Sequence, residues 1–225
     1  MGVMNLLEVR NLYVYYKNTL IVEDINFDLD YSKILGIVGP SGSGKSTIIW
    51  SILGIIEEMG GRFTGHIKFK CKKLNYRPKW DEISIVPQLA MNSFNPVLKI
   101  KDSIDELYEF TSMTKEDFDE NVEELLKMVN LEKQVLNSYP HELSGGMKQR
   151  IAIVCALCTN PNLLILDEST TGLDLLVEAE ILYYLKNIKE SLNLSIIFVS
   201  HDKRLVNAFC DEIINMEKTI IEESV

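Results

Sequence analysis

Hydrophobic and polar residues alternate along the first part of the chain. Residues 6–30 contain runs such as Leu7-Glu8-Val9-Arg10 and Ile25-Asn26-Phe27-Asp28. Residues 65–70 alternate in the same way. Alternation places apolar side chains on one face of a strand and polar ones on the other. These segments therefore predict an antiparallel sheet with one solvated face.

Four other segments are apolar almost throughout and predict buried strands. They are residues 34–38, 83–86, 163–168 and 195–199. Strands of this kind are typical of a mostly parallel sheet covered by helices on both faces. The order of elements therefore predicts an α/β fold, with the antiparallel strands as an added subdomain.

Residues 89–160 have a helical character. Segments 103–110 and 115–129 are predicted helices, and Thr114 with Asp117 resembles an N-terminal cap. The acidic run 116–124 is the solvated face of the second helix. Its other face is an apolar stripe at helical spacing, made of Phe118, Val122, Leu125, Leu126 and Val129. This stretch is interpreted as a helical insertion in the α/β core.

The charge and composition narrow the class of protein. The chain has 225 residues, 46% of them hydrophobic, and a net charge of −10 from 23 basic and 33 acidic residues. We find no local basic patch, so nucleic acid is not an expected partner. No apolar run is long enough to span a bilayer and no signal segment is evident, which predicts a cytosolic chain.

The four cysteines are interpreted as reduced core thiols. Cys155 and Cys158 form a C-x-x-C pair, but they lie in an apolar, helix-like run with no second pair; the others are Cys71 and Cys210. Helix packing is therefore favoured over zinc or redox use.

A phosphate-binding pattern follows the first buried strand. Residues 39–47 read Gly-Pro-Ser-Gly-Ser-Gly-Lys-Ser-Thr, and a predicted helix, 48–53, comes next. Glycines bring the backbone close to an anion, and the helix N-terminus adds positive potential. Lys45 is expected to reach the β- and γ-phosphates, and Ser46 to ligate Mg²⁺. The loop alone leaves ATPase, GTPase and kinase open.

A second glycine-rich turn, Ser144-Gly145-Gly146, opens the predicted helix 147–154. It is a second potential anion-binding end. One nucleotide does not need two such ends from one chain, so this end is expected to serve the nucleotide of another copy.

Polar residues follow two of the buried strands. Asp167 and Glu168 end the strand 163–168, and we expect them to face opposite ways, toward Mg²⁺ and beyond the γ-phosphate. His201 follows the strand 195–199, where catalytic residues of open α/β sheets gather. Tyr16 leaves two interpretations open: stacking on an adenine ring, or a half-buried strand aromatic.

Together these residues resemble the nucleotide-binding subunit of an ATP-binding-cassette (ABC) transporter. Residues 39–47 resemble its Walker A motif, Leu143 to Met147 its signature, and Leu163 to Glu168 its Walker B motif. Gln88 is similar to the Q-loop glutamine, Leu173-Asp174 to the D-loop, His201 to the switch histidine and Tyr16 to the adenine-stacking aromatic.

The resemblance implies ATP and Mg²⁺ held between two ATPase subunits. Glu168, His201 and Gln88 would be catalytic, and Ser46, Gln88 and Asp167 would organise Mg²⁺. The implied nucleotide-binding residues are Tyr16, Gly39, Ser41, Gly42, Ser43, Gly44, Lys45, Ser46 and Thr47, with Ser144, Gly145 and Gly146 from the opposing subunit. Asp174 is grouped with them and would couple the two sites across the interface.

The resemblance also implies an organisation and partners. Residues 1–225 would be one ATPase domain, with a P-loop core and β subdomain over about 1–87 and 161–225 and a helical subdomain over about 88–160. Its partners would be membrane permease subunits, a second ATPase subunit (identical or a paralogue) and a solute-binding protein, with no nucleic acid. The chain would lie peripherally on the cytoplasmic side of the membrane.

A finer resemblance is to the peptide and nickel importer branch. Segments 91–97 and 138–143 are similar to that branch. Its members usually carry a long C-terminal extension, whereas this chain stops at Val225. Ser32 and Ser169 stand where the family usually has Gly and Pro.

The alternative to a transporter subunit is a soluble cassette ATPase of DNA repair, chromosome structure or translation. Such chains carry coiled-coil inserts or two cassettes, which this sequence lacks.

Overall fold

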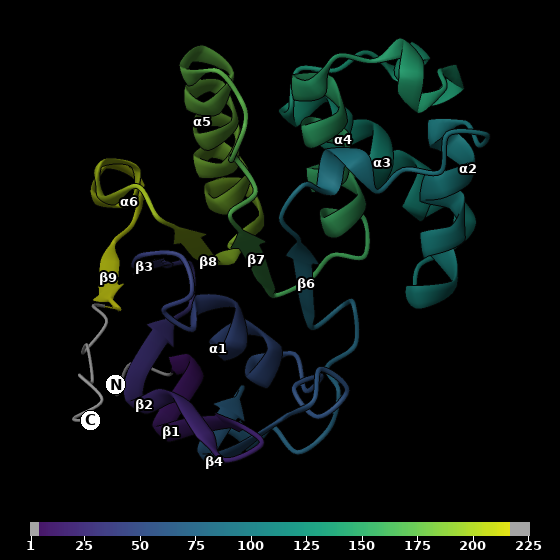
Figure 1. Ribbon diagram of the computed structural model, residues 1–225. Helices are drawn as coiled ribbons and strands as arrows, with labels where there is room; N and C mark the ends of the chain where they lie inside the picture. Colours follow the sequence, from purple (N-terminus) through teal and green to yellow (C-terminus); the bar gives the residue numbers. More distant parts are fainter. Residues whose placement is uncertain (1–4, 217–225) are drawn as a thin grey trace. The chain divides into compact units, whose positions relative to one another are not determined.

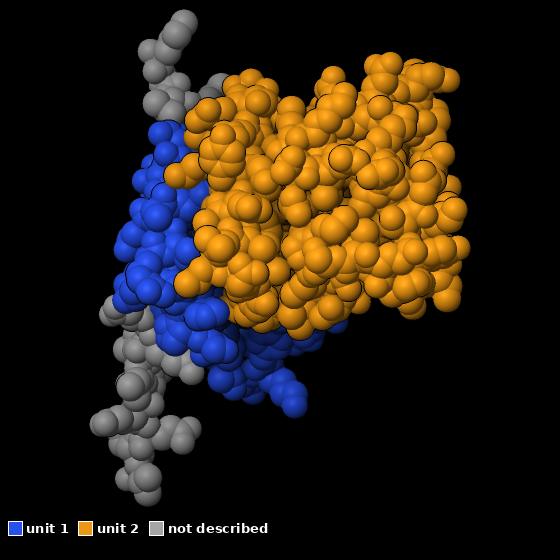
Figure 2. All heavy atoms as spheres, turned by 90° about the horizontal axis from the view of Figure 1, so that it is seen from above, with its two compact units in different colours: residues 1–77, 197–225 blue, residues 78–196 orange. Residues whose placement is uncertain are grey.

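The computed structural model describes residues 5–216. These residues form two compact units (Figure 2). The first comprises the residues up to 77 and those from 197 on, and the second comprises residues 78–196. Each unit is described by itself below, with the elements labelled as in Figure 1.

The first unit contains the predicted antiparallel sheet, in the order β2-β1-β4-β5. Its strands are β1 (Asn5–Tyr16), β2 (Thr19–Asp30), β4 (Gly61–Phe69) and β5 (Lys72–Lys73). Leu7, Val9, Leu12 and Val14 of β1 are fully buried. The alternation along residues 6–30 therefore indicated the sheet and its buried face correctly.

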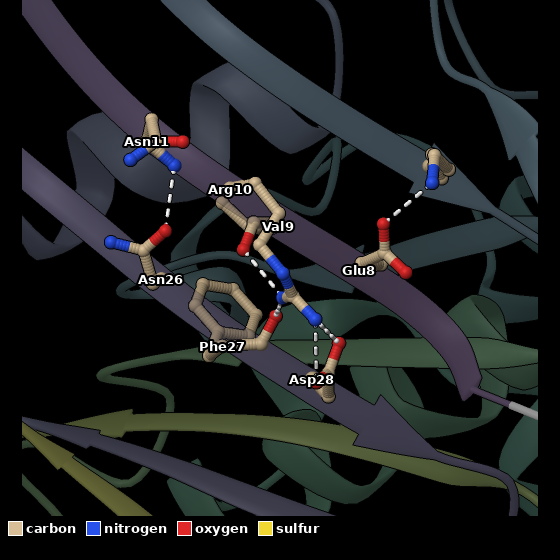
Figure 3. A network of polar contacts seen from close by, with 8 residues as sticks. Glu8, Val9, Arg10, Asn11, Asn26, Phe27 and Asp28 are labelled. Atoms are coloured by element: carbon tan, nitrogen blue, oxygen red, sulfur yellow. Dashed lines mark hydrogen bonds and ion pairs between the residues drawn. The ribbon is translucent and has the colours of Figure 1, made fainter. Parts of the chain in front are cut away.

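A network of side chains supports this sheet where its pairing is irregular. The β1–β2 register shifts between Val9 and Leu12, and Asn11 has a φ of 49°. Asn26 Oδ1 accepts from the Asn11 amide at 2.8 Å, and Arg10 Nη2 contacts both carboxylate oxygens of Asp28 at 2.8 Å (Figure 3). Asn26 thus satisfies the Asn11 amide where the ladder is irregular, and the Arg10–Asp28 ion pair joins β1 to β2.

Parallel strands and two helices complete the first unit. β3 (Ile34–Val38) lies between β8 (Ser195–Ser200) and β9 (Glu212–Asn215). The helices are α1 (Lys45–Ile52) and α6 (Lys203–Phe209). The predicted helix after the phosphate loop therefore begins three residues earlier than the apolar run suggested. Ser32, just before β3, has a φ of 56°. This is the left-handed region that favours glycine, the usual residue here in the family that the sequence resembles.

The second unit combines strands with the helical segment. β6 (Ile83–Val86) pairs in parallel with β7 (Leu163–Asp167), and the first two residues of β8 also belong here. The helices are α2 (Ile100–Asp105), α3 (Lys115–Met128), α4 (Gly145–Leu157) and α5 (Leu175–Leu192), with 3-10 turns at Ala90–Asn92, Glu106–Phe110, Lys133–Asn137 and Pro140–Glu142.

The predicted start and apolar stripe of α3 are both confirmed. Thr114 Oγ1 accepts from the Asp117 amide at 3.2 Å. Every residue of the stripe is buried, from Phe118 to Val129. The preceding helix differs from the prediction: it begins at Ile100 and tightens to a 3-10 turn from Glu106.

One expectation about the surface is wrong: Cys71 is exposed rather than in the core. Residues 59–80 contain no aspartate or glutamate. Two of the basic residues there, Lys68 and Arg77, pair with Glu8 and Glu58 from other segments. None of the helices within residues 5–216 is long and apolar enough to traverse a bilayer.

Candidate functional site

The phosphate loop of the first unit connects β3 to α1. Gly42 and Gly44 have φ values of 75° and 94°, in the left-handed region that favours glycine. Gly44 is the N-cap of α1 and no side chain caps that end. A Cβ at Gly44 would lie 2.7 Å from Val22 Cγ2. The N–H groups at the start of α1 therefore keep the arrangement that binds anions.

Lys45 is folded over this loop. It is only 4% exposed, and its Nζ donates to the carbonyl oxygens of Gly39 at 2.9 Å and Pro40 at 3.0 Å. Ser43 Oγ is buried and has no hydrogen-bond partner within residues 5–216. A buried ammonium and an unpaired hydroxyl in one loop suit a phosphate oxygen, which would accept from both. Three more predicted site residues lie in the same loop and the start of α1: Ser46 is half-buried, Thr47 is buried and Ser41 is exposed.

His201 and Tyr16 also lie in the first unit. His201 is exposed and directly follows β8, the neighbour of β3. The phosphate loop follows β3, so His201 and this loop each follow one of two neighbouring strands. The next residue, Asp202, caps α6, and its hydrogen bonds to Arg204 lower its carboxyl pKa to about 2.

Tyr16 ends β1 opposite Gly61. Its hydroxyl is buried with no partner among the described residues, and a Cβ at Gly61 would lie 3.2 Å from its Cζ. The Arg62 guanidinium lies over the ring of the neighbouring Tyr15, 4.9 Å from the ring centroid. The two interpretations of Tyr16 are both compatible with this half-buried position, and adenine stacking stays a prediction.

In the second unit, the end of β7 differs from the sequence-based expectation. The strand ends at Asp167, which is 8% exposed. Glu168 has a φ of 47° and has left the strand. Strand alternation therefore does not orient it. A non-glycine residue in this region costs about 1–3 kcal/mol, and such strain clusters at functional sites.

The structure brings Glu168 together with Gln88. Gln88 Nε2 donates to Glu168 Oε2 at 3.4 Å. Both residues follow the parallel neighbours β6 and β7, and Leu89 has a φ of 60°. Two residues that are 80 positions apart in the chain thus meet at the carboxyl ends of their strands.

The second glycine-rich turn is the start of α4. Ser144 is exposed and is the N-cap, and its Oγ accepts from the Met147 amide at 3.2 Å. A Cβ at Gly146 would lie 2.8 Å from Val177 Cγ1 on α5, whereas one at Gly145 would meet only Met91 Sδ at 3.7 Å. This first turn therefore packs closely against α5.

Two side chains here have structural contacts that sequence reasoning missed. Asp174 is the N-cap of α5 and accepts from the amides of Leu176 and Val177 at 3.1 and 3.0 Å. An aspartate before a helix signals this role. Arg150 donates to Gly146, Val129 and Asn130 carbonyl oxygens at 3.3 Å. No sequence signal indicated these contacts, because they depend on where α3 ends.

An apolar groove of about 360 Å³ lies beside the segment after Gln88. Its lining includes Trp80, Phe94, Leu98 and Leu107, with Cys155 from α4. Burial raises the pKa of the Cys155 thiol to about 12. The pKa of Cys158 is raised for the same reason. Both thiols are therefore protonated near neutral pH, as expected of buried cysteines that pack within a helix.

Within residues 5–216, no group of three or more His, Cys, Asp or Glu side chains could hold a metal by itself. Magnesium is usually bound by one or two carboxylates together with substrate phosphates. Asp167, Ser46 and Gln88 fit that pattern in their donor types.

Comparison with known proteins decides the family. The sequence matches the ABC transporter family over residues 22–171. The chain belongs to this family. As a member it is an ATP-binding subunit of a transport complex, and it hydrolyses ATP to power transport.

Its relatives include peptide transporters. It is 38% identical to the oligopeptide transport ATP-binding protein AppD of Bacillus subtilis and to OppD of Haemophilus influenzae, each over 94% of this chain and 69% of the relative. It is 36% identical to the dipeptide transport ATP-binding protein DppD of Caldanaerobacter subterraneus, over 92% of this chain and 67% of the relative. The chain thus spans about two thirds of their length.

Solved structures agree on the fold. CbiO1 of Clostridium perfringens, part of the ABC transporter complex CbiONQ, has a TM-score of 0.84 and 28% identity, covering 94% of this chain and 84% of that one. A second ATP-binding subunit of an ABC transporter has a TM-score of 0.77 and 27% identity, covering 93% and 85%. The predicted fold class, a P-loop core with an antiparallel β subdomain and helical insertion, is confirmed.

Proposed function

We propose that this ABC transporter subunit powers the import of peptides through partner membrane subunits. The observation that carries the proposal is the 38% identity to oligopeptide transport ATP-binding proteins over 94% of the chain. The resemblance found from the sequence also left nickel as a possible solute class. The names of these relatives favour peptides.

The phosphate loop is proposed to hold the phosphates of ATP. Lys45 Nζ would exchange its two carbonyl acceptors for phosphate oxygens, which carry a full charge and so form stronger hydrogen bonds. Gly39, Ser41, Gly42, Ser43, Gly44 and Thr47 complete the loop, and Tyr16 stacks on the base. Bound Mg²⁺ neutralises charge on the phosphates. We assign Ser46 to it from the first unit, and Asp167 and Gln88 from the second.

Glu168 is proposed to polarise the attacking water. Its strained backbone fixes the direction of the carboxylate, and Gln88 restrains it through the 3.4 Å contact. A carboxylate positioned at the end of a strand can accept a proton from a water molecule within hydrogen-bond reach. His201 is proposed to steady the γ-phosphate from the end of β8.

The active site is proposed to be completed by a second ATPase subunit. Ser144, Gly145 and Gly146 lie at the exposed start of α4, and Asp174 lies at the start of α5, which packs against that turn. An exposed helix N-terminus of this kind can close on a phosphate supplied from outside the chain. The second subunit is either an identical chain or a paralogue.

The apolar groove is proposed to receive a segment of a membrane permease subunit. It is open, is lined by aromatic and aliphatic side chains, and borders the segment that follows Gln88. A permease segment seated there would reach Gln88 and Glu168 through one short stretch of chain.

The subunit would then lie peripherally on the cytoplasmic face of the membrane, and a solute-binding protein would deliver the peptide on the outer side. No nucleic-acid partner is included. The domain boundaries near residues 88 and 160 remain a prediction.

The test compares Glu168→Gln with Lys45→Ala in the chain and its transport complex. Glu168→Gln should keep ATP binding and lower turnover by about 10² or more, because water activation is lost. Lys45→Ala should lose ATP binding. Glu190→Gln, an exposed glutamate of α5, is the matched control and should behave as wild type.

Uptake separates the solute classes. Cells carrying Glu168→Gln should lose uptake of a labelled tripeptide and retain nickel uptake. Loss of nickel uptake with unchanged peptide uptake would contradict the proposed substrate. Loss of ATP affinity in Glu168→Gln to the extent seen in Lys45→Ala would contradict the role of Glu168.

A further inference from the structure

Arg150 connects two helices of the second unit. Its Nε donates to the Gly146 carbonyl oxygen at 3.3 Å, and its Nη1 donates to the carbonyl oxygens of Val129 and Asn130 at 3.3 Å. Gly146 lies in the first turn of α4, while Val129 is the C-cap of α3. One planar guanidinium thus joins the start of α4 to the end of α3.

The acceptors at the end of α3 are suited to this cation. The last carbonyl groups of a helix have no partner within the helix and carry its negative end charge. Asn130 has a φ of 53°, which turns the chain away from α3. Arg150 forms no ion pair with a carboxylate within residues 5–216, so its contacts are with backbone groups. Its position therefore depends on the geometry of the helix end.

A hollow lies next to Arg150 at the start of α4. It has a volume of about 530 Å³ and is bounded by Leu131, Val135, Leu143, Met147 and Arg150. Val177 of α5 contacts the same turn at Gly146. Val177 limits how close the turn can approach α5, and the guanidinium ties the turn to α3.

We propose that Arg150 is a positioning residue for the Ser144–Gly146 turn, holding it at the angle at which it meets the nucleotide of the second subunit. The inference rests on the proposed composite site. Lysine cannot replace the guanidinium fully, because an ammonium is a point charge without the planar fork that spans two acceptor groups. Arg150 itself contacts neither ATP nor a reacting atom in this assignment.

Amide exchange tests the positioning directly. The Met147 amide is bonded to Ser144 Oγ, and the Lys148 amide to the Ser144 carbonyl oxygen at 3.0 Å. In Arg150→Met their exchange should rise roughly tenfold or more, the effect of losing a hydrogen bond to a charged group. The Ile48 amide of α1, in the first unit, is the internal reference and should not change. Equal acceleration at all three amides, or none, would overturn the proposal.

Controls separate shape from charge. Arg150→Lys should give a smaller rise, because it keeps the charge and one bond. The side-chain ammonium of Lys148, on the same helix, donates to no residue within the described chain. Lys148→Met removes this cation and should leave the exchange of the two amides unchanged. A rise in Lys148→Met as large as in Arg150→Met would also overturn the assignment.

Complementation distinguishes a positioning defect from a folding defect. Arg150→Met mixed with Lys45→Ala should regain turnover, because one site of the mixed dimer joins an intact loop to an intact turn. KM for ATP should change little in Arg150→Met alone, while kcat falls. Ser144→Arg with Lys45→Ala is the reference pair. Rescue of the reference pair without rescue of the Arg150 pair refutes the positioning role. If the wild-type chain alone hydrolyses ATP, failure of both pairs refutes the composite site; if it needs a paralogue, both pairs stay silent. In either case the exchange result decides the role of Arg150.

Discussion

Gly146→Ala is expected to destabilise the second unit through one contact. The new Cβ would lie 2.8 Å from Val177 Cγ1, closer than carbon atoms normally approach. Val177 is poorly able to move, because β-branched side chains have few rotamers and its amide is held by Asp174 at 3.0 Å. Overpacking of this kind costs about 1–3 kcal/mol.

Helix propensity opposes this cost. Replacing glycine by alanine in a helix gains about 1 kcal/mol. The free energy of unfolding should therefore fall by about 0–2 kcal/mol in Gly146→Ala. Gly145→Ala is the matched control, since its Cβ would meet only Met91 Sδ at 3.7 Å. It has the same propensity gain without the clash and should be neutral or stabilising.

The assay is a double-mutant cycle with Val177→Ala, measured by urea unfolding. Removing the Val177 methyl groups makes room for the new Cβ. The double variant should recover about 1–3 kcal/mol relative to the sum of the single changes, since residues in contact couple by such amounts. A coupling energy below about 0.5 kcal/mol is the value expected of independent sites. Such a value, or equal effects of Gly145→Ala and Gly146→Ala, would refute the reasoning.

Two further predictions concern the nucleotide. Tyr16→Ala should weaken ATP binding by about 1–3 kcal/mol, the range for stacking on a base, while Tyr16→Phe should bind normally. Because the Tyr16 hydroxyl is buried without a partner among the described residues, Tyr16→Phe should also be no less stable in a thermal melt. A lower melting temperature for Tyr16→Ala with unchanged ATP affinity would favour the structural interpretation. If the chain forms a homodimer, Lys45→Ala mixed with Ser144→Arg should regain ATPase activity in mixed dimers; a rate per molecule independent of concentration, with no regain on mixing, would contradict the composite site.

The sequence alone determined the elements whose signal is local. The alternation in residues 6–30, the buried run 83–86 and the cap at Thr114 each depend on neighbouring residues, and the structure has them where they were predicted. The phosphate loop belongs to the same class, because its glycines, lysine and helix start are contiguous. The family resemblance rests on such motifs and their order.

The tertiary structure decided what depends on distant segments. Strand alternation predicted the direction of Glu168, but the strand ends one residue earlier and a left-handed backbone turns Glu168 away from it. The contacts of Gln88 with Glu168 and of Arg150 with the end of α3 join residues that are 80, 21 and 20 positions apart. A pattern of residues can show that a strand or helix forms. The contacts made at the ends of strands and helices depend on strand register, helix length and backbone conformation. Packing across the whole unit sets all three.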